Sequence, residues 1–220
     1  MTRSATKPIT TDIVLVDIIN FSKLSTHQQA EIITFLTKSY IKMIKVMLKN
    51  SNLQHQKLFL GNVSTGDGFY TILNPRLKGF GAILGLSFNH FSELIAKKYP
   101  YFEGIRIAVH YGEVLGFKDI LGQDNYIGKG LNDCARYLEL KEFSISTVII
   151  SKESYRQFEM FLVRYKHYDR LLLKHELKRS QNYIFRDKHG IKREGVMIWL
   201  RRGGIINPPD MNFNSLLNKR

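Results

Sequence analysis

Residues 13–18 read IVLVDI, a run of aliphatic and β-branched residues that is interrupted only by Asp17. A run this short and this apolar predicts a strand that is buried on both faces, at the centre of a sheet. The carboxylate of Asp17 stands near the end of that strand, where burial is costly unless the group is paired with a cation or bound to a metal. The stretch therefore predicts the middle of the fold and a candidate functional residue together.

Helices and hairpins alternate after this strand. Thr26 and Gln29 have the spacing of a capping box, which predicts the start of a helix whose apolar periodicity continues to Met47. The further predicted elements are a hairpin of residues 57–63 and 69–73, a helix at 80–98, a hairpin of residues 105–110 and 114–117 with its turn at 111–113, a helix at 131–140, a strand at 147–150, a helix at 152–158, strands at 183–186 and 196–200, and an irregular tail at 207–210. This order predicts an α+β fold in which helices pack on a central, mostly antiparallel sheet.

The length and composition fit a single folded domain. The chain has 220 residues, of which 44% are hydrophobic and 24% charged, which excludes a disordered protein. We expect the domain over residues 13–202, between an N-terminal segment of residues 1–12 and a C-terminal tail of residues 203–220. The only cysteine, Cys134, excludes an intrachain disulfide and fits a reducing compartment. Because the opening residues have no apolar signal region and no apolar run is long enough to cross a bilayer, we expect a cytoplasmic protein that does not enter membranes.

The net charge of +14 points to a polyanionic partner. Residues 152–202 contribute +8 of that charge. No helix-turn-helix, ribonucleoprotein or zinc-ligand motif accompanies it, since the seven histidines are scattered and only one cysteine is present. A nucleic-acid-binding module is an alternative, but only the charge supports it. We therefore expect no nucleic-acid partner.

Asp67 is a second candidate residue, in the turn TGDGF at residues 65–69. If this hairpin lies beside the first strand, the carboxylates of Asp17 and Asp67 project from one end of adjacent strands. Two carboxylates placed in this way suit two Mg²⁺ or Mn²⁺ ions that bridge a triphosphate. Asn132 and Arg136, four residues apart on a predicted helix, share one face and suit a sugar oxygen and a phosphoryl group.

Four motifs, in this order, resemble those of the class III nucleotidyl cyclases. They are VDI with FSKL at residues 16–18 and 21–24, TGD with Phe69, RIAVHYG at residues 106–112, and IGKGLNDCAR at residues 127–136. The sequence KHGI at residues 188–191, which runs into the strand at 196–200, is a looser match to the closing hairpin of that family. The resemblance implies a ferredoxin-like or palm-like class III cyclase domain, which converts a nucleoside triphosphate to a 3′,5′-cyclic monophosphate and diphosphate.

The resemblance also implies roles for individual residues. Asp17 and Asp67, with the carbonyl of Ile18, would bind two ions of Mn²⁺ or Mg²⁺. Asn132 would orient the ribose, and Arg136 would stabilise charge on the α-phosphate. The β- and γ-phosphates would be held by the backbone N–H groups of Asn20, Phe21, Ser22 and Lys23. The side chain of Lys188 would also contact them, and Lys192 is the alternative to Lys188. In this family the aspartates and the Asn/Arg pair face each other across a subunit interface, which implies a homodimer with two composite sites.

Two base-recognition positions depart from the family pattern. Adenylate cyclases usually have Lys and Asp there, and guanylate cyclases have Glu and Cys, whereas this chain has Val63 and Asn125. Val63 offers no partner to a purine edge, and the amide of Asn125 complements uracil or, when flipped, cytosine. A pyrimidine nucleoside triphosphate is therefore favoured as substrate. The residues leave UTP and CTP open, and of the two we expect UTP.

Stand-alone cyclases with these altered positions resemble the uridylate and cytidylate cyclases of bacterial anti-phage Pycsar systems. There the cyclic nucleotide activates a separate effector protein, so the resemblance implies a second messenger made for antiviral defence. Three alternatives stay open. They are an adenylate or guanylate cyclase with atypical base recognition, a catalytically silent nucleotide-binding homologue, and a diguanylate cyclase, which shares the palm-like sheet but lacks a helix with the Asn/Arg pair.

Overall fold

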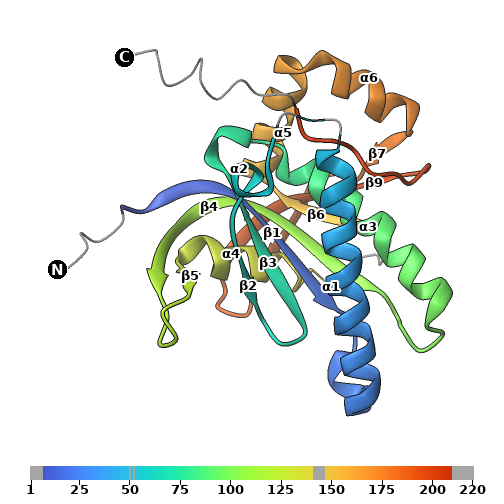
Figure 1. Ribbon diagram of the computed structural model, residues 1–220. Helices are drawn as coiled ribbons and strands as arrows, with labels where there is room; N and C mark the ends of the chain where they lie inside the picture. Colours follow the sequence, from blue (N-terminus) through green and yellow to red (C-terminus); the bar gives the residue numbers. More distant parts are fainter. Residues whose placement is uncertain (1–6, 50, 52, 141–146, 210–220) are drawn as a thin grey trace.

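The computed structural model describes residues 7–49, 51, 53–140 and 147–209 (Figure 1). Its strands are β1 (Ile9–Ile18), β2 (Phe59–Ser64), β3 (Gly68–Leu73), β4 (Ile105–Lys118), β5 (Asp124–Ile127), β6 (Val148–Ser151), β7 (Leu177–Arg179), β8 (Tyr183–Arg186) and β9 (Lys192–Leu200). Its helices are α1 (Thr26–Leu48), α2 (His55–Leu58), α3 (Gly81–Lys98), α4 (Lys129–Tyr137), α5 (Lys152–Arg164) and α6 (Lys166–Lys174), with 3-10 turns at Phe21–Lys23 and Pro75–Leu77. Residues 1–6 of the expected N-terminal segment and residues 210–220 of the expected tail lie outside the described residues.

One sheet contains all these strands. Its order is β2-β3-β1-β4-β6-β9-β7, with β5 paired to β4 and β8 paired to β9. β4 and β6 run parallel, and the other pairs are antiparallel. This arrangement confirms the predicted α+β fold with a mostly antiparallel central sheet.

β1 is a central strand of this sheet, as its apolar sequence predicts. It pairs with β3 on one side and β4 on the other, and Ile13, Val14 and Val16 are completely buried. The strand begins at Ile9, earlier than expected, because residues 9–12 pair with residues 111–114 of β4. β1 therefore extends into the segment that we expected to precede the domain.

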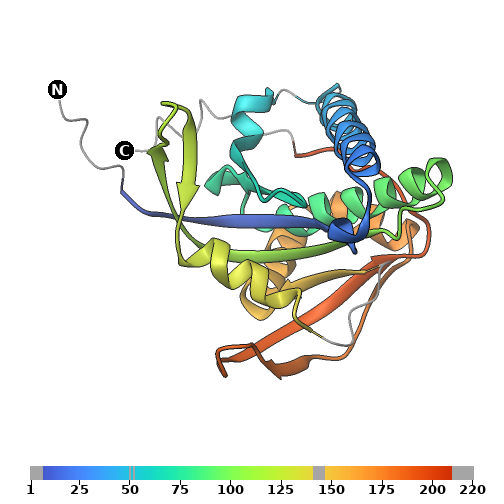
Figure 2. The same cartoon turned by 90° about the horizontal axis from the view of Figure 1, so that it is seen from below.

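Helices cover both faces of the sheet. On one face α1, α3 and α5 build a core that includes Ile32, Leu84 and Phe158. On the other face α4 contributes Cys134 and Tyr137 to a second core. Figure 2 shows α1 and α4 on opposite sides of the sheet. A strand that lies between two such layers needs apolar side chains on both faces, which explains the pattern of β1.

The predicted turn at residues 111–113 is wrong, because β4 runs through it as one strand of 14 residues. A Cβ on Gly112 would lie 2.7 Å from the Cα of Gly130, so this glycine allows α4 to approach the strand closely. The hairpin instead joins β4 to β5, through a turn in which Gly122 has a φ of 74° and donates its N–H to the carbonyl of Asp119.

Several predicted boundaries also shift. α1 begins with a capping box at Ser25 and Gln28, one residue before the predicted pair, and each side chain bonds the other residue's backbone N–H. α5 continues to Arg164, and α2, β5, α6 and β7 were not predicted. α6 has only nine residues, of which Tyr168 and Leu172 are buried, and so short an apolar pattern does not by itself distinguish a helix from a strand. Within the described ranges, no helix is long and apolar enough to cross a bilayer.

Candidate active site

Asp17 and Asp67 are brought together by the pairing of β1 with β3. Asp17 lies opposite Gly68, and the N–H of Ile18 donates to the carbonyl of Asp67 at 2.9 Å. A Cβ on Gly68 would lie 1.9 Å from the carbonyl oxygen of Val16, so only glycine allows the two backbones to approach this closely. The predicted juxtaposition of the two carboxyl-bearing residues therefore has a backbone cause.

The carboxylate of Asp17 is largely shielded from water and is paired with a cation. Arg106 in β4 donates to its Oδ2 from Nε at 2.8 Å and from Nη2 at 2.5 Å. Burial raises the pKa of Asp17 above its usual value, the nearby charge of Asp67 raises it further, and Arg106 opposes both effects. Two carboxylates that repel each other in this way form an environment that a cation stabilises.

The donor set fits a hard divalent cation. The carboxylates of Asp17 and Asp67 and the neighbouring backbone oxygens are the ligands that Mg²⁺ and Mn²⁺ prefer. In the part of the chain that the structure describes, no cluster of three or more His, Cys, Asp or Glu side chains is placed to hold a metal. Two side-chain carboxylates do not fill the coordination shell of such an ion, so an ion held here needs further oxygen ligands.

Arg106 was not among the predicted site residues. It lies directly opposite Asp17 in the pairing of β1 with β4. The sequence shows an arginine at the start of an apolar strand. Whether that arginine meets Asp17 depends on which strands pair and in which register. Sequence periodicity does not contain that information.

The segment after Asp17 forms a tight turn before α1. Asn20 adopts a left-handed conformation with a φ of 54°, and its Nδ2 donates to Oε2 of Glu103 at 2.6 Å. The N–H of Lys23 donates to the carbonyl of Asn20, so this group, one of four expected to hold phosphates, is already engaged. The N–H groups of Phe21 and Ser22 meet no acceptor among the described residues.

Asn132 and Arg136 lie on α4, which packs on β4 and β1 on the face opposite α1. Asn132 is exposed, whereas only 20% of the Arg136 side chain is accessible to solvent. Nη1 of Arg136 lies 2.7 Å from Oε1 of Glu139, three residues further along the chain. The predicted pair thus shares one helix, with its amide open to solvent and its guanidinium held by a carboxylate.

The hairpin between β8 and β9 approaches the end of α4. The backbone N–H of Lys188 donates to Oε2 of Glu139 at 2.9 Å, while the Lys188 side chain is exposed. Lys192, the alternative phosphate contact, lies 3.6 Å from Glu194. Of the two lysines, Lys188 is therefore the one whose backbone shares a carboxylate with Arg136.

Val63 lies on the α4 side of the sheet, and Asn125 in β5 precedes Tyr126, which packs on that side. Val63 and Tyr126 both pack against the core beneath α4. The ring of Tyr126 covers Gly61, and its hydroxyl donates to the carbonyl of Leu60 at 2.9 Å. Oδ1 of Asn125 accepts the N–H of Tyr126 at 2.8 Å, which leaves the amide NH₂ as a donor.

Tyr70 connects the two halves of the candidate site. It lies opposite Val63 in β2 and Leu15 in β1. Burial raises the pKa of Tyr70 to about 12; the charge of Arg136 lowers it, and those of Asp17 and Asp67 raise it. The charges of Asp17, Asp67 and Arg136 therefore all act on the Tyr70 phenol.

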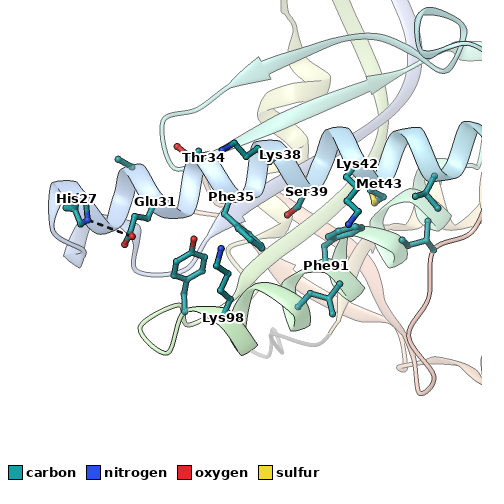
Figure 3. Close-up of a pocket in the computed structure, with 15 residues that line it drawn as sticks. His27, Glu31, Thr34, Phe35, Lys38, Ser39, Lys42, Met43, Phe91 and Lys98 are labelled. Atoms are coloured by element: carbon teal, nitrogen blue, oxygen red, sulfur yellow. Dashed lines mark ion pairs between the residues drawn. The ribbon is translucent and has the colours of Figure 1, made fainter.

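A groove of about 750 Å³ lies elsewhere, between α1 and α3. Figure 3 shows Phe35 and Met43 of α1 facing Phe91 and Lys98 of α3 across it. Nζ of Lys98 lies 4.4 Å from the centre of the Phe35 ring. None of the predicted site residues lines this groove, so the candidate active site lies on another part of the surface.

No protein-family model and no curated protein matches the chain by sequence. Solved structures match it over most of its length. The catalytic core of a rhodopsin-guanylyl cyclase with converted specificity, in complex with ATPalphaS, has a TM-score of 0.60 and 16% identity, with 90% of this chain and 100% of that chain covered. The guanylate cyclase domain of RhGC from Catenaria anguillulae, in complex with GTP, has a TM-score of 0.57 and 17% identity, with coverage of 89% and 99%. The adenylyl cyclase CyaB from P. aeruginosa has a TM-score of 0.53 and 16% identity, with coverage of 90% and 99%. These similarities confirm the predicted fold.

Proposed function

We propose that this chain, which has the fold of class III cyclase catalytic domains, converts a nucleoside triphosphate to its 3′,5′-cyclic monophosphate and diphosphate. The observation that carries the proposal is the placement of Asp17 beside Asp67, which Gly68 makes possible. Arg136 on α4 adds a cation, which a second copy of the chain would bring to these carboxylates. Carboxylates for metals and an arginine for a phosphoryl group are the parts that this reaction requires.

Asp17 and Asp67 would hold two divalent ions, which when bound lower the pKa of the attacking hydroxyl and neutralise the triphosphate. The N–H groups of Phe21 and Ser22 are free to bind phosphate oxygens in the turn that follows. Arg136 donates to the α-phosphate, where negative charge accumulates in the transition state. The exposed amide of Asn132 orients the ribose so that its 3′-hydroxyl attacks in line.

We further propose that two copies assemble with composite sites. Ile120 and Leu121 at the tip of the β4–β5 hairpin are largely exposed, and Ile127, at the end of β5 away from that tip, is half exposed. Large aliphatic side chains at the tip of a projecting hairpin are typical of a surface that contacts a partner. In such a dimer, Asp17 and Asp67 of one subunit would meet Asn132 and Arg136 of the other.

The proposed substrate is a pyrimidine triphosphate, and UTP is favoured. The similar structures come from guanylyl and adenylyl cyclases, so this choice depends on the residues of this chain. Val63 has no polar group to offer a purine edge, and it lies opposite the bulky Tyr70. With Oδ1 bonded to Tyr126, the amide of Asn125 presents its NH₂, which complements O4 of uracil but not the amino group of cytosine. The cyclic product would act as a second messenger for a separate effector in bacterial antiviral defence.

The test is to incubate the protein with each of the four triphosphates and Mn²⁺ and to identify the products by mass spectrometry. We expect cyclic UMP as the main product and none from the Asp67→Asn variant. A cyclic purine as the main product would contradict the pyrimidine assignment but not the cyclase assignment. Binding of a triphosphate without turnover, measured by calorimetry, would instead favour the silent homologue.

A further inference from the structure

We propose that Glu139 is a positioning residue that fixes Arg136 and the Lys188 hairpin in one arrangement, so that both meet the same triphosphate. The inference rests on the function proposed above and adds a residue to it. Glu139 lies just beyond α4, three residues after Arg136. Neither the motifs of the sequence nor the predicted site includes it.

The two carboxylate oxygens of Glu139 bond to different elements. Oε1 accepts from Nη1 of Arg136 at 2.7 Å, and Oε2 accepts from the backbone N–H of Lys188 at 2.9 Å. One donor belongs to α4, and the other belongs to the hairpin between β8 and β9. The carboxylate is therefore a bridge between the two groups that are expected to contact the α-phosphate and the terminal phosphates.

This bridge limits the conformations of the Arg136 side chain. An arginine has several rotatable bonds, and a charge-assisted bond at one end of its guanidinium limits them. Among the described residues, Nη1 of the Arg136 guanidinium donates to Glu139, so this pairing leaves other N–H donors of the group for a phosphate. A donor that is already oriented stabilises the transition state without reorganising during the reaction.

A second ionic bridge holds the same hairpin independently of Glu139. Nη2 of Arg193 in β9 lies 2.8 Å from Oδ1 of Asp133 on α4 and 2.9 Å from Oδ2 of Asp187. Oδ1 of Asp187 accepts the N–H groups of His189 and Ile191, which closes the hairpin turn. Removal of the Glu139 carboxylate should therefore free Arg136 without unfolding the hairpin.

The first experiment compares Glu139→Gln with the wild-type protein and with Glu153→Gln. Glu153 is a matched control because it pairs with Arg156 three residues away on α5, which packs on the face of the sheet opposite α4. We expect Glu139→Gln to lower kcat by about 10-fold with less than a threefold change in KM and an unchanged Tm, because an oriented transition-state donor is lost. Glu153→Gln should match the wild type.

The same substitution in an Arg136→Lys background tests whether Glu139 acts through Arg136. A lysine cannot present the forked guanidinium, so the effect of Glu139→Gln should shrink to less than twofold there. A residue with a merely structural role would give the same loss in both backgrounds.

A pair of substitutions at Lys188 tests the other half of the bridge. Lys188→Ala removes the side chain but keeps the N–H that Glu139 accepts, whereas Lys188→Pro removes both. Lys188 is the second residue of a turn in which the N–H of Gly190 donates to Asp187, a position that proline favours. We expect kcat of the proline variant to be at least threefold below that of the alanine variant, and the two to be equal when residue 139 is Gln.

The outcomes separate this inference from the proposed function. If the wild-type protein turns over no triphosphate, the function itself is contradicted. If the wild type is active and Glu139→Gln retains the kcat of the Glu153→Gln control, only the role of Glu139 is overturned. A rise in kcat in Glu139→Gln would overturn it as well, because the carboxylate would then restrain Arg136 from the substrate.

Discussion

Arg106 donates two hydrogen bonds to one oxygen of Asp17: Nε lies 2.8 Å and Nη2 2.5 Å from Oδ2. The pair is fixed by register, since the two residues lie opposite each other in β4 and β1. A divalent ion on the same carboxylate must share it with, or displace, this guanidinium. The guanidinium that pairs with Asp17 is therefore a competitor of the metal.

Arg106→Ala tests this competition. Without divalent ions, the variant leaves the shielded carboxylate of Asp17 unpaired beside Asp67, and the free energy of unfolding should fall by about 1–3 kcal/mol. Added Mn²⁺ should raise the Tm of the variant more than that of the wild type, because the ion no longer competes with an arginine. Thermal unfolding over a Mn²⁺ titration measures both effects, with Arg156→Ala on α5 as a surface control. Equal Mn²⁺ shifts in variant and wild type would contradict the competition.

Gly68→Ala and Gly66→Ala form a matched pair in the β2–β3 turn. A Cβ on Gly68 would lie 1.9 Å from the carbonyl of Val16, whereas a Cβ on Gly66 would meet nothing within 4 Å. Gly66 has a φ of 89°, so alanine there brings only backbone strain of about 1 kcal/mol. Alanine at Gly68 must separate β3 from β1, so we expect a loss above about 3 kcal/mol and the loss of Mn²⁺ binding. Urea unfolding and calorimetry measure the two quantities; a similar cost at both positions would argue against the close approach.

Mixing Asp17→Ala chains with Arg136→Ala chains tests composite sites. Each variant alone should be inactive, because every site in its homodimer lacks one part. A mixed dimer has one intact site, so random exchange of subunits should restore roughly a quarter of wild-type activity. Turnover is measured after the two variants are co-refolded or exchanged. If the mixture stays inactive while size-exclusion chromatography shows dimers, the two parts do not meet across an interface.

Asp12 makes stability depend on pH. Its Oδ2 accepts the N–H groups of Gly79 and Gly81, and its Oδ1 is buried with no donor among the described residues. Burial raises the pKa of Asp12 from 3.8 to about 6, against the opposing effects of these bonds and of Lys78. Between these two pH values the folded protein binds a proton that the unfolded chain has released. The free energy of unfolding should therefore fall as pH rises from about 4 to about 6, by about 3 kcal/mol from this group.

Asp12→Asn should remove this contribution. The amide oxygen can still accept both N–H groups, but no charge is buried at any pH. Urea unfolding between pH 4 and pH 7 should show the variant gaining stability relative to the wild type as pH rises. A constant difference across that range would show that the pKa of Asp12 is not raised by burial.

Local patterns predicted the parts of the site that lie within one element. β1 with Asp17, the TGDG turn with Asp67 and the helix with Asn132 and Arg136 all depend on periodicity or turn chemistry between near neighbours. These signals are short-range, and the structure has each element close to where the sequence indicates it.

The residues that the sequence did not reveal depend on contacts between distant segments. Gly112 is a residue type that favours turns, but here it lies inside β4 and allows Gly130 of α4 to pack closely against the strand. Arg106 pairs with Asp17 because the register of β1 and β4 places them opposite each other. Glu139 bonds Lys188 because the hairpin between β8 and β9 approaches the end of α4. No local pattern encodes which strand lies opposite, or which loop returns to a helix end.

The uninterrupted course of β4 has a consequence for regulation. Its fourteen residues extend about 45 Å, from Arg106 beside the aspartates to the hairpin whose tip exposes Ile120 and Leu121. If that tip recruits a second copy, the amount of working enzyme below the dissociation constant rises with the square of the amount of chain. Doubling its synthesis would then increase output about fourfold. Expression level alone would then regulate the activity: at low abundance most chains would be inactive monomers, and a modest rise in abundance would increase the activity more than proportionally.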